Sequence, residues 1–329
     1  MITDNKINIL EQCRLMIITL LVFLLFNNIT ATPRYASKYG QSCNLCHVNP
    51  TGGGVRTLYG AQFFCKMDMQ WTPETDFECL EDYQPKIGKN FQFGGDFRSI
   101  YWAADGDSSI DRNNSFLTMQ ADMYLAIAPA DKVLIYLEKG IGNAFEAYVL
   151  MRGLTETGVL KVGRFVPSYG WRFAEHKSFV REFLGFTAYP VRGVQVSEDH
   201  GVEFGLYPME WEFSTSITNG STAGKGAGGI DFGNEGKVLY TRLLKRLSLG
   251  DLSLTIGGSY RYAEFGKDPP VSRYAGGFWG ANFLSWTLVG ETDWVLKNDV
   301  TSLVTTQVLN FQVRSGLNLF AGYDFWDPD

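Results

Sequence analysis

Residues 252–262 read LSLTIGGSYRY, in which apolar and polar side chains alternate. Successive side chains of a β-strand point to opposite faces of a sheet, so this stretch predicts a strand with one apolar and one polar face. The same alternation recurs from about residue 90 onward, for example at 90–102, 115–128 and 317–325. The chain is therefore predicted to be mainly β.

A soluble β-sandwich and a membrane barrel both contain such strands, and the loops favour the barrel. Gaps after every second predicted strand are short, whereas most of the others are longer and polar or rich in Gly. This asymmetry is typical of a porin-like, antiparallel transmembrane β-barrel of the bacterial outer membrane. About thirteen strands are predicted, at 90–102, 115–128, 133–140, 143–152, 159–165, 200–206, 211–219, 236–246, 251–263, 276–283, 287–296, 303–312 and 317–325.

Two further sets of side chains fit a barrel in lipid. Aromatic residues near strand ends are expected to form interfacial girdles. They are Tyr101, Trp102, Trp286, Trp294 and Trp326. Acids on the polar faces either draw cations into the lumen or form an ordinary polar lining. They are Asp122, Glu138, Glu291 and Asp293.

The last predicted strand, 317–325, is followed by the turn-like sequence Asp327-Pro328-Asp329. By the alternation of loops, that end lies on the outer side. A barrel in lipid has to close, because an open edge leaves backbone groups unpaired. We therefore expect one or more C-terminal strands to be missing from this barrel.

A second pattern precedes the strands, where residues 43–47 read CNLCH. C-x-x-C-H is the attachment pattern of a c-type haem, in which Cys43 and Cys46 bind the two vinyl groups and His47 is the proximal iron ligand. The alternatives are half of a zinc site, a redox C-x-x-C and a structural disulfide. The remaining cysteines are poorly spaced for zinc, and no βαβ context suggests a thioredoxin-like motif. We predict one covalent haem c.

The N-terminus predicts export. Lys6 and Arg14 precede an apolar run at 15–26, which is too short to span a bilayer and suits a signal peptide. Ala31 offers a small residue for cleavage, so 1–31 is assigned as the signal peptide. The alternative is an uncleaved membrane anchor. Export agrees with the haem, since c-type attachment takes place outside the cytoplasm.

Two cysteines remain in the exported chain, Cys65 and Cys79. In an oxidising compartment they are expected to form a disulfide. A loop of this length would stabilise the segment by roughly 3 kcal/mol. Two free thiols are the alternative.

Residues 32–88 are predicted to be a small cytochrome c-like segment, ahead of the barrel at 89–329. Gly52, Gly53 and Gly54 would let the backbone pass close to the porphyrin. Arg56 is either the partner of a haem propionate or a solvated side chain. The distal position of the iron is either open to water or filled by one of four candidates, Met67, Met69, His176 and His200.

This order of signal peptide, haem motif and barrel resembles the fused cytochrome–porins of the bacterial outer membrane, which include iron-oxidising cytochromes. Tyr39-Gly40 and the motif at 43–47 match the first part of the family pattern, and Tyr59-Gly60-Ala61-Gln62-Phe63 matches its aromatic-Gly-x-x-Phe element. The motif match covers residues 33–63 only. Pro50-Thr51-Gly52-Gly53-Gly54 stands where family members carry a Leu-Thr-Pro-like run.

The resemblance implies electron transfer across the outer membrane through a single haem held at or in the barrel. It implies extracellular Fe(II) as the donor, periplasmic electron carriers as partners, and contact with outer-membrane lipid. A solute porin with an accessory haem segment and an exported, soluble β-sandwich cytochrome are the alternatives. The net charge of -6 argues against a nucleic-acid partner.

Overall fold

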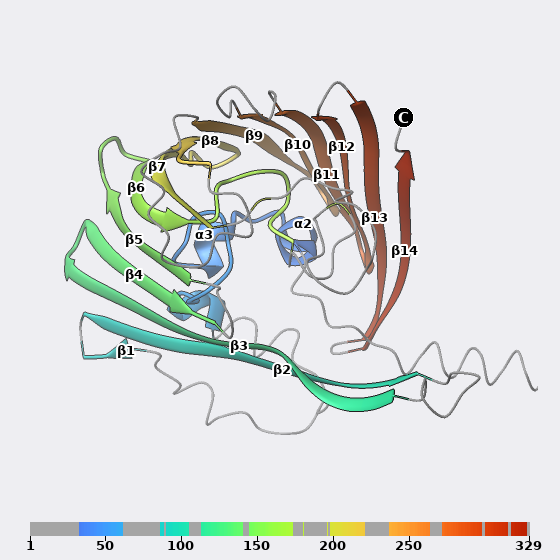
Figure 1. The fold of residues 1–329 in the computed structure, drawn as a ribbon, viewed down its shortest axis with the longest axis horizontal. Helices are drawn as coiled ribbons and strands as arrows, with labels where there is room; N and C mark the ends of the chain where they lie inside the picture. The colour runs from blue at the N-terminus through green and yellow to red at the C-terminus, as the bar shows by residue number, and fades with distance from the viewer. Residues whose placement is uncertain are drawn as a thin grey trace, which may run out of the picture.

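The computed structural model of the chain describes residues 33–61, 86–88, 90–104, 113–140, 145–173, 180, 196, 198–220, 237–263, 272–297, 300–314 and 317–327. One antiparallel sheet dominates these residues, with fourteen strands that pair in sequence order. The sheet curls into a wall around two short helices, α2 and α3 (Figure 1). Within the described ranges no pairing joins β1 to β14, the two ends of the strand order.

The thirteen strands predicted from the sequence are all present, and a two-residue strand, β1, precedes them. The strands are β1 (Lys86–Ile87), β2 (Phe91–Ala104), β3 (Asn113–Ala130), β4 (Val133–Lys139), β5 (Phe145–Arg152), β6 (Gly158–Phe165), β7 (Asp199–Leu206), β8 (Trp211–Thr218), β9 (Val238–Leu249), β10 (Leu252–Ala263), β11 (Ser272–Phe283), β12 (Trp286–Lys297), β13 (Val300–Arg314) and β14 (Leu317–Asp327). The largest change of a boundary is at β11, which begins four residues early because Ser272 still pairs with Lys297 of β12.

The connections confirm the predicted asymmetry. Turns after β3, β5, β7, β9, β11 and β13 contain only two to five residues. The opposite end carries the long connections, such as 166–198 between β6 and β7. Six short turns therefore lie at one end of the wall, as in outer-membrane barrels, and the longer connections lie at the opposite end, although the connection between β12 and β13 there contains only two residues.

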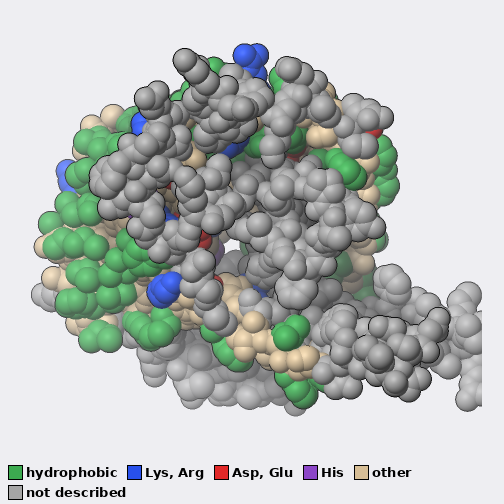
Figure 2. All heavy atoms as spheres, in the orientation of Figure 1, with side chains coloured by type: hydrophobic (Ala, Val, Ile, Leu, Met, Phe, Trp, Pro, Cys, Tyr) green, Lys and Arg blue, Asp and Glu red, His purple; other side chains and the backbone are tan. Residues whose placement is uncertain are grey.

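The polarity of the wall shows which face meets lipid. On β10 the polar Thr255 is only 1% exposed, whereas the apolar Ile256 beside it is 60% exposed. Figure 2 shows hydrophobic side chains gathered over the outer side of the wall at β4 and β5. A soluble sandwich would bury the apolar face, so this inverted pattern is that of a transmembrane β-barrel and excludes the sandwich.

The outer aromatic side chains agree with the girdle prediction in part. Tyr101 and Trp294 are exposed near the long loops, and Trp286 is exposed beside a short turn, where its ring packs against Phe311 at 4.4 Å. The prediction was wrong for Trp326, which packs against a buried cluster inside the wall. The side chain of Trp102 lies outside the described part of the structure.

Two segments enter the space inside the wall. The first, residues 33–61, contains α2 (Arg34–Tyr39), which contacts β10, β11 and β12, and α3 (Cys43–Cys46). The second, which we call the strap, is residues 166–173. No helix among the described residues is long and apolar enough to cross a membrane.

Candidate haem-attachment site

A single helical turn presents the C-x-x-C-H motif. The turn α3 spans Cys43–Cys46, and the backbone N–H of His47 donates to the Cys43 carbonyl at 2.9 Å. Residues at positions i and i+3 share one face of a helix, so both thiols lie on the same side. His47 then leaves the helix with an extended backbone, at φ −121° and ψ 146°.

A narrow hairpin follows the motif. His47 and Arg56 form an antiparallel pair, and the Val48 N–H donates to the Val55 carbonyl at 3.0 Å. The connection between these strands includes Gly52, Gly53 and Gly54, whose φ angles are 91°, 79° and 61°. Residues other than Gly rarely adopt such angles, so the three glycines let the chain fold back beside His47.

The hairpin is fitted closely against its surroundings. A Cβ atom at Gly54 would lie 2.8 Å from Cζ of Tyr136 on β4, and one at Gly53 would lie 2.8 Å from Nε of Arg172 on the strap. Val48 and Val55 are buried in a cluster with wall residues of β3, β4, β5 and β6. The motif is therefore held inside the barrel and is not a free tail.

The environment of His47 keeps its imidazole neutral. Burial, together with the positive charges of Arg56 and Arg172, lowers the pKa of His47 to about 4. Its Nδ1 atom is buried and has no hydrogen-bond partner among the described residues. A neutral imidazole is the form that ligates a metal.

The two thiols are poorly suited to the redox and zinc alternatives. Burial and the negative charge of Glu212 together raise the pKa of Cys43 to about 11. Burial also raises the pKa of Cys46, while the positive charge of Arg56 acts in the opposite direction. Redox C-x-x-C motifs need a lowered pKa, and zinc binding needs thiolates. The searched part of the chain contains no group of three or more potential metal ligands.

Cys43 and Cys46 are free thiols beside a half-buried imidazole, with no disulfide between them. This set of donors fits covalent attachment of a c-type haem, in which neither sulfur has to remain a thiolate. Arg56 lies close enough to lower the pKa of both His47 and Cys46, and its side chain is exposed. Arg56 thus lies beside the motif, where the partner of a haem propionate would have to lie.

The structure removes one candidate for the distal ligand. His200 lies on β7, where Asp199 and Glu203 are buried and His200 is exposed. Its side chain therefore points away from the lumen, and the prediction that His200 could reach the iron is wrong. Met67, Met69 and His176 lie outside the described residues, as does the predicted Cys65–Cys79 disulfide. No Met or second His side chain among those described points into the lumen.

The strap is a part of the interior that the sequence did not indicate. Ser168 donates from its N–H at 3.0 Å and its hydroxyl at 2.8 Å to Glu203, which also forms an ion pair with Lys161 at 2.7 Å. At the far side the Trp171 N–H donates to Glu291 on β12 at 2.8 Å. The strap therefore crosses the lumen between β7 and β12. The apolar and aromatic side chains of this loop, such as Tyr169, Trp171 and Phe173, were the available signal.

These bonds also change the interpretation of the predicted lumen acids. Glu291 and Asp293 face inward as expected, but both are fully buried. Each holds the strap, since the Tyr169 hydroxyl donates to Asp293 at 2.9 Å. They are therefore structural anchors and do not line an open path for cations.

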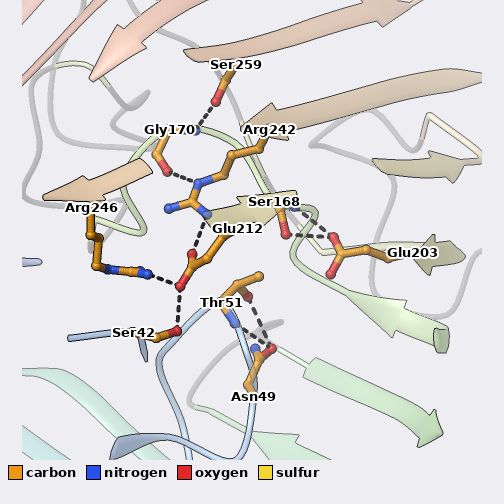
Figure 3. A network of polar contacts seen from close by, with 10 residues as sticks. All are labelled: Ser42, Asn49, Thr51, Ser168, Gly170, Glu203, Glu212, Arg242, Arg246 and Ser259. Atoms are coloured by element: carbon orange, nitrogen blue, oxygen red, sulfur yellow. Dashed lines mark hydrogen bonds and ion pairs between the residues drawn. The ribbon is translucent and has the colours of Figure 1, made fainter. Parts of the chain in front are cut away.

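A network of buried charges lies between the motif and the strap (Figure 3). Glu212 on β8 accepts from Arg242 of β9 at 3.0 Å and also pairs with Arg246. Arg242 donates from Nε to the Gly170 carbonyl at 2.8 Å. The Ser42 hydroxyl, one residue before Cys43, donates to the same carboxylate at 2.5 Å. Sequence reasoning missed this network because Glu212 is 30 residues from Arg242 and 170 residues from Ser42, on separate elements.

No protein-family model matches the chain, and no curated protein matches it in sequence. Among solved structures, OprB of Pseudomonas putida is 8% identical, with 69% of this chain and 72% of that chain covered and a TM-score of 0.49. The outer membrane channel DcaP of Acinetobacter baumannii is 9% identical, with 74% and 81% covered and a TM-score of 0.41. OmpT of Vibrio cholerae is 10% identical, with 74% and 89% covered and a TM-score of 0.39. Likenesses of this size leave the function to be argued from the site itself.

Proposed function

We propose that this outer-membrane barrel holds one covalently attached haem c in its lumen and passes electrons between an extracellular donor and periplasmic carriers. The observation that carries the proposal is the position of the C-x-x-C-H turn. The turn lies inside the wall, and the backbone of the hairpin that follows it is tied to two strands, by Arg152 of β5 to the Val48 carbonyl at 3.2 Å and by Gln92 of β2 to the Arg56 carbonyl.

Each residue of the motif has a defined part in this proposal. Cys43 and Cys46 would bind the two vinyl groups as thioethers, and His47 would ligate the iron through its neutral imidazole. Arg56 would bind a propionate. The haem would supply one-electron chemistry, while the protein fixes its position and limits its contact with water.

Solute diffusion is the alternative function that a porin-like barrel suggests. The fixed strap argues against it, because its contacts extend from Glu203 on β7 to Glu291 on β12. Residues 33–61 add a second insert, with α2 against β10 to β12. Electrons can pass between groups across such inserts, whereas solutes need a continuous path of water.

Extracellular Fe(II) as the donor rests on the resemblance of residues 33–63 to the cytochrome–porins. The test begins with detergent-extracted protein from cells that attach c-type haem. A haemochrome assay should give one haem per chain, and the Cys43→Ala/Cys46→Ala variant should give none. Absence of haem from the unaltered chain would overturn the proposal.

The electron-transfer part is tested separately in liposomes that contain the haem-loaded barrel and enclose a soluble cytochrome. Fe(II) added outside should reduce the enclosed cytochrome, and liposomes with the cysteine variant should not. Equal rates for the two proteins would refute electron transfer through the haem. A large single-channel conductance of the unaltered barrel would instead favour the solute porin.

A further inference from the structure

The carboxylate of Glu212 lies in a pocket of positive charge on the inner wall. In the register of β8 and β9, Glu212 faces Leu244, so Arg242 and Arg246 are its diagonal neighbours on either side. Glu212 is 1% exposed, Arg242 is 5% exposed and Arg246 is 4% exposed. Both guanidinium groups bond the carboxylate, which is therefore ionised and fixed in place.

One acceptor position of this carboxylate is used by the haem segment. Ser42 stands at the N-cap of α3, where a Ser side chain usually accepts a hydrogen bond from the first turn of its own helix. Here it makes no cap bond, and its hydroxyl donates to Glu212 at 2.5 Å instead. A hydroxyl bond to a carboxylate at this distance belongs to the strong, charge-assisted class. The Ser42 hydroxyl therefore bonds the wall in place of the first turn of its own helix.

The same cluster binds the strap. Arg242 donates to the Gly170 carbonyl at 2.8 Å, and the Gly170 N–H donates to Ser259 of β10 at 2.8 Å. The Arg242 guanidinium also lies 4.9 Å from the centre of the Phe278 ring, which restricts it further. One buried carboxylate and one arginine therefore connect the two inserts of the lumen.

We propose that Glu212 is a positioning residue, and that the cluster of Glu212, Arg242 and Arg246 is the docking site that fixes the first haem cysteine in the barrel. Only the predicted effect on the redox potential rests on the proposed function; docking of the segment does not depend on it. Cys43 directly follows Ser42, so the cluster sets the orientation of the turn that carries Cys43 and His47. It also places a net positive charge beside that turn, which favours the reduced state of a haem held there.

The test uses Ser42→Ala, because this variant removes the bond to the haem segment and leaves Glu212 paired with both arginines. Ser42→Thr retains the hydroxyl. Ser168→Ala is the matched control, since Ser168 also donates a hydroxyl to a buried, salt-bridged wall carboxylate, Glu203, but holds only the strap. Glu212→Gln is not the primary variant, because unpaired buried cations could prevent folding.

The first readout needs no haem. Full-length, haem-free protein in detergent is treated with a maleimide, and mass spectrometry follows alkylation of the peptide that contains Cys43 and Cys46. We expect Ser42→Ala to be alkylated about tenfold faster than the unaltered chain, a difference of about 1.4 kcal/mol in the opening of the turn. Ser42→Thr and Ser168→Ala should match the unaltered chain. A rate for Ser42→Ala equal to that of the unaltered chain would overturn the docking site.

The second readout is the midpoint potential of the haem-loaded protein. Ser42→Ala should shift it, Ser42→Thr should restore it, and Ser168→Ala should leave it unchanged. Identical potentials in all four proteins would refute control of the haem by the cluster. If no haem attaches to the unaltered chain, the proposed function fails, and the alkylation rates still decide whether Glu212 docks the segment.

Discussion

Gly60 provides a direct test of how the haem turn is held. Residues 58–61 are helical and pack on the C-x-x-C turn. A Cβ at Gly60 would lie 2.7 Å from Cα and 2.8 Å from the carbonyl carbon of Cys46. Both are backbone atoms, so no rotation of a side chain relieves the contact. Gly60→Ala should therefore push the helix away from Cys46.

The size of the effect follows from the cost of overpacking, which is about 1–3 kcal/mol. Since 1.4 kcal/mol corresponds to a factor of ten, the open form of the segment should become about 5- to 150-fold more populated. Gly60 has no left-handed backbone angle, so this cost comes from the contact alone.

Hydrogen exchange of the full-length, haem-free protein measures this population directly. Peptides from residues 43–61 should lose protection in Gly60→Ala, and strands β9 and β10 should not. Gly277→Ala is the control, because a Cβ at Gly277 would meet nothing within 4 Å. Equal protection of residues 43–61 in the two variants would show that the close packing of Gly60 on Cys46 does not stabilise the turn.

Three further perturbations test the interior. Burial lowers the pKa of His47 from 6.5 to about 4, so the haem-free segment should be most stably docked above pH 6.5 and less stably docked as the pH falls toward 4. Hydrogen exchange of residues 43–61 measures this pH dependence, and His47→Gln should abolish it. Glu203→Gln leaves Lys161 buried without its ion pair and frees Ser168, so it should cost about 3–5 kcal/mol in a denaturant titration and raise the conductance. Gly54→Ala should destabilise the hairpin by more than the about 1–2 kcal/mol that its positive φ alone costs, because the added Cβ also meets Tyr136; adding Tyr136→Phe should recover only part of the loss in the same titration, since Cζ of that ring stays 2.8 Å away.

The strands were predictable because their signal is local. A β-strand reverses its side chains at every residue, so the alternation at 252–262 already assigns Thr255 and Ser259 to one face. The structure places both inside the wall. The motif at 43–47 was equally local, since helical spacing alone brings Cys43 and Cys46 to one side.

The errors have a physical origin in single-residue register. His200 and Asp199 are adjacent, and only one of them can face the lumen. The alternation within the strand indicates which one, because His200 shares its face with the apolar Val202 and Phe204, and the prediction did not apply this pattern to His200. Asp199 is buried with Glu203 on the other face, and its carboxylate accepts from the backbone N–H of Gly220 at 2.6 Å.

The strap could not be predicted for a related reason. Its position depends on wall groups that are distant in sequence, such as Asp293, which is 124 residues from Tyr169. The loop between β6 and β7 carries its own apolar side chains into the lumen, where Trp171 packs edge-on against Phe278 at 5.2 Å. Sequence reasoning allowed His176 of this long loop to reach inward, but loop length alone does not show which residues of a loop enter the lumen or which wall groups they bond.

The charges of the inner wall connect these observations. In a solute porin, polar lining residues face water, whereas here Glu203, Glu212 and Glu291 are buried and each bonds a segment that enters the lumen. Burial of a carboxylate is unfavourable unless it is well bonded, so removal of an insert would take hydrogen bonds away from buried carboxylates of the wall. The wall and its inserts therefore stabilise each other, and the C-x-x-C-H turn is part of the barrel interior. Such an arrangement suits a carrier of electrons, which needs a fixed distance between groups, better than a channel that must open to solutes.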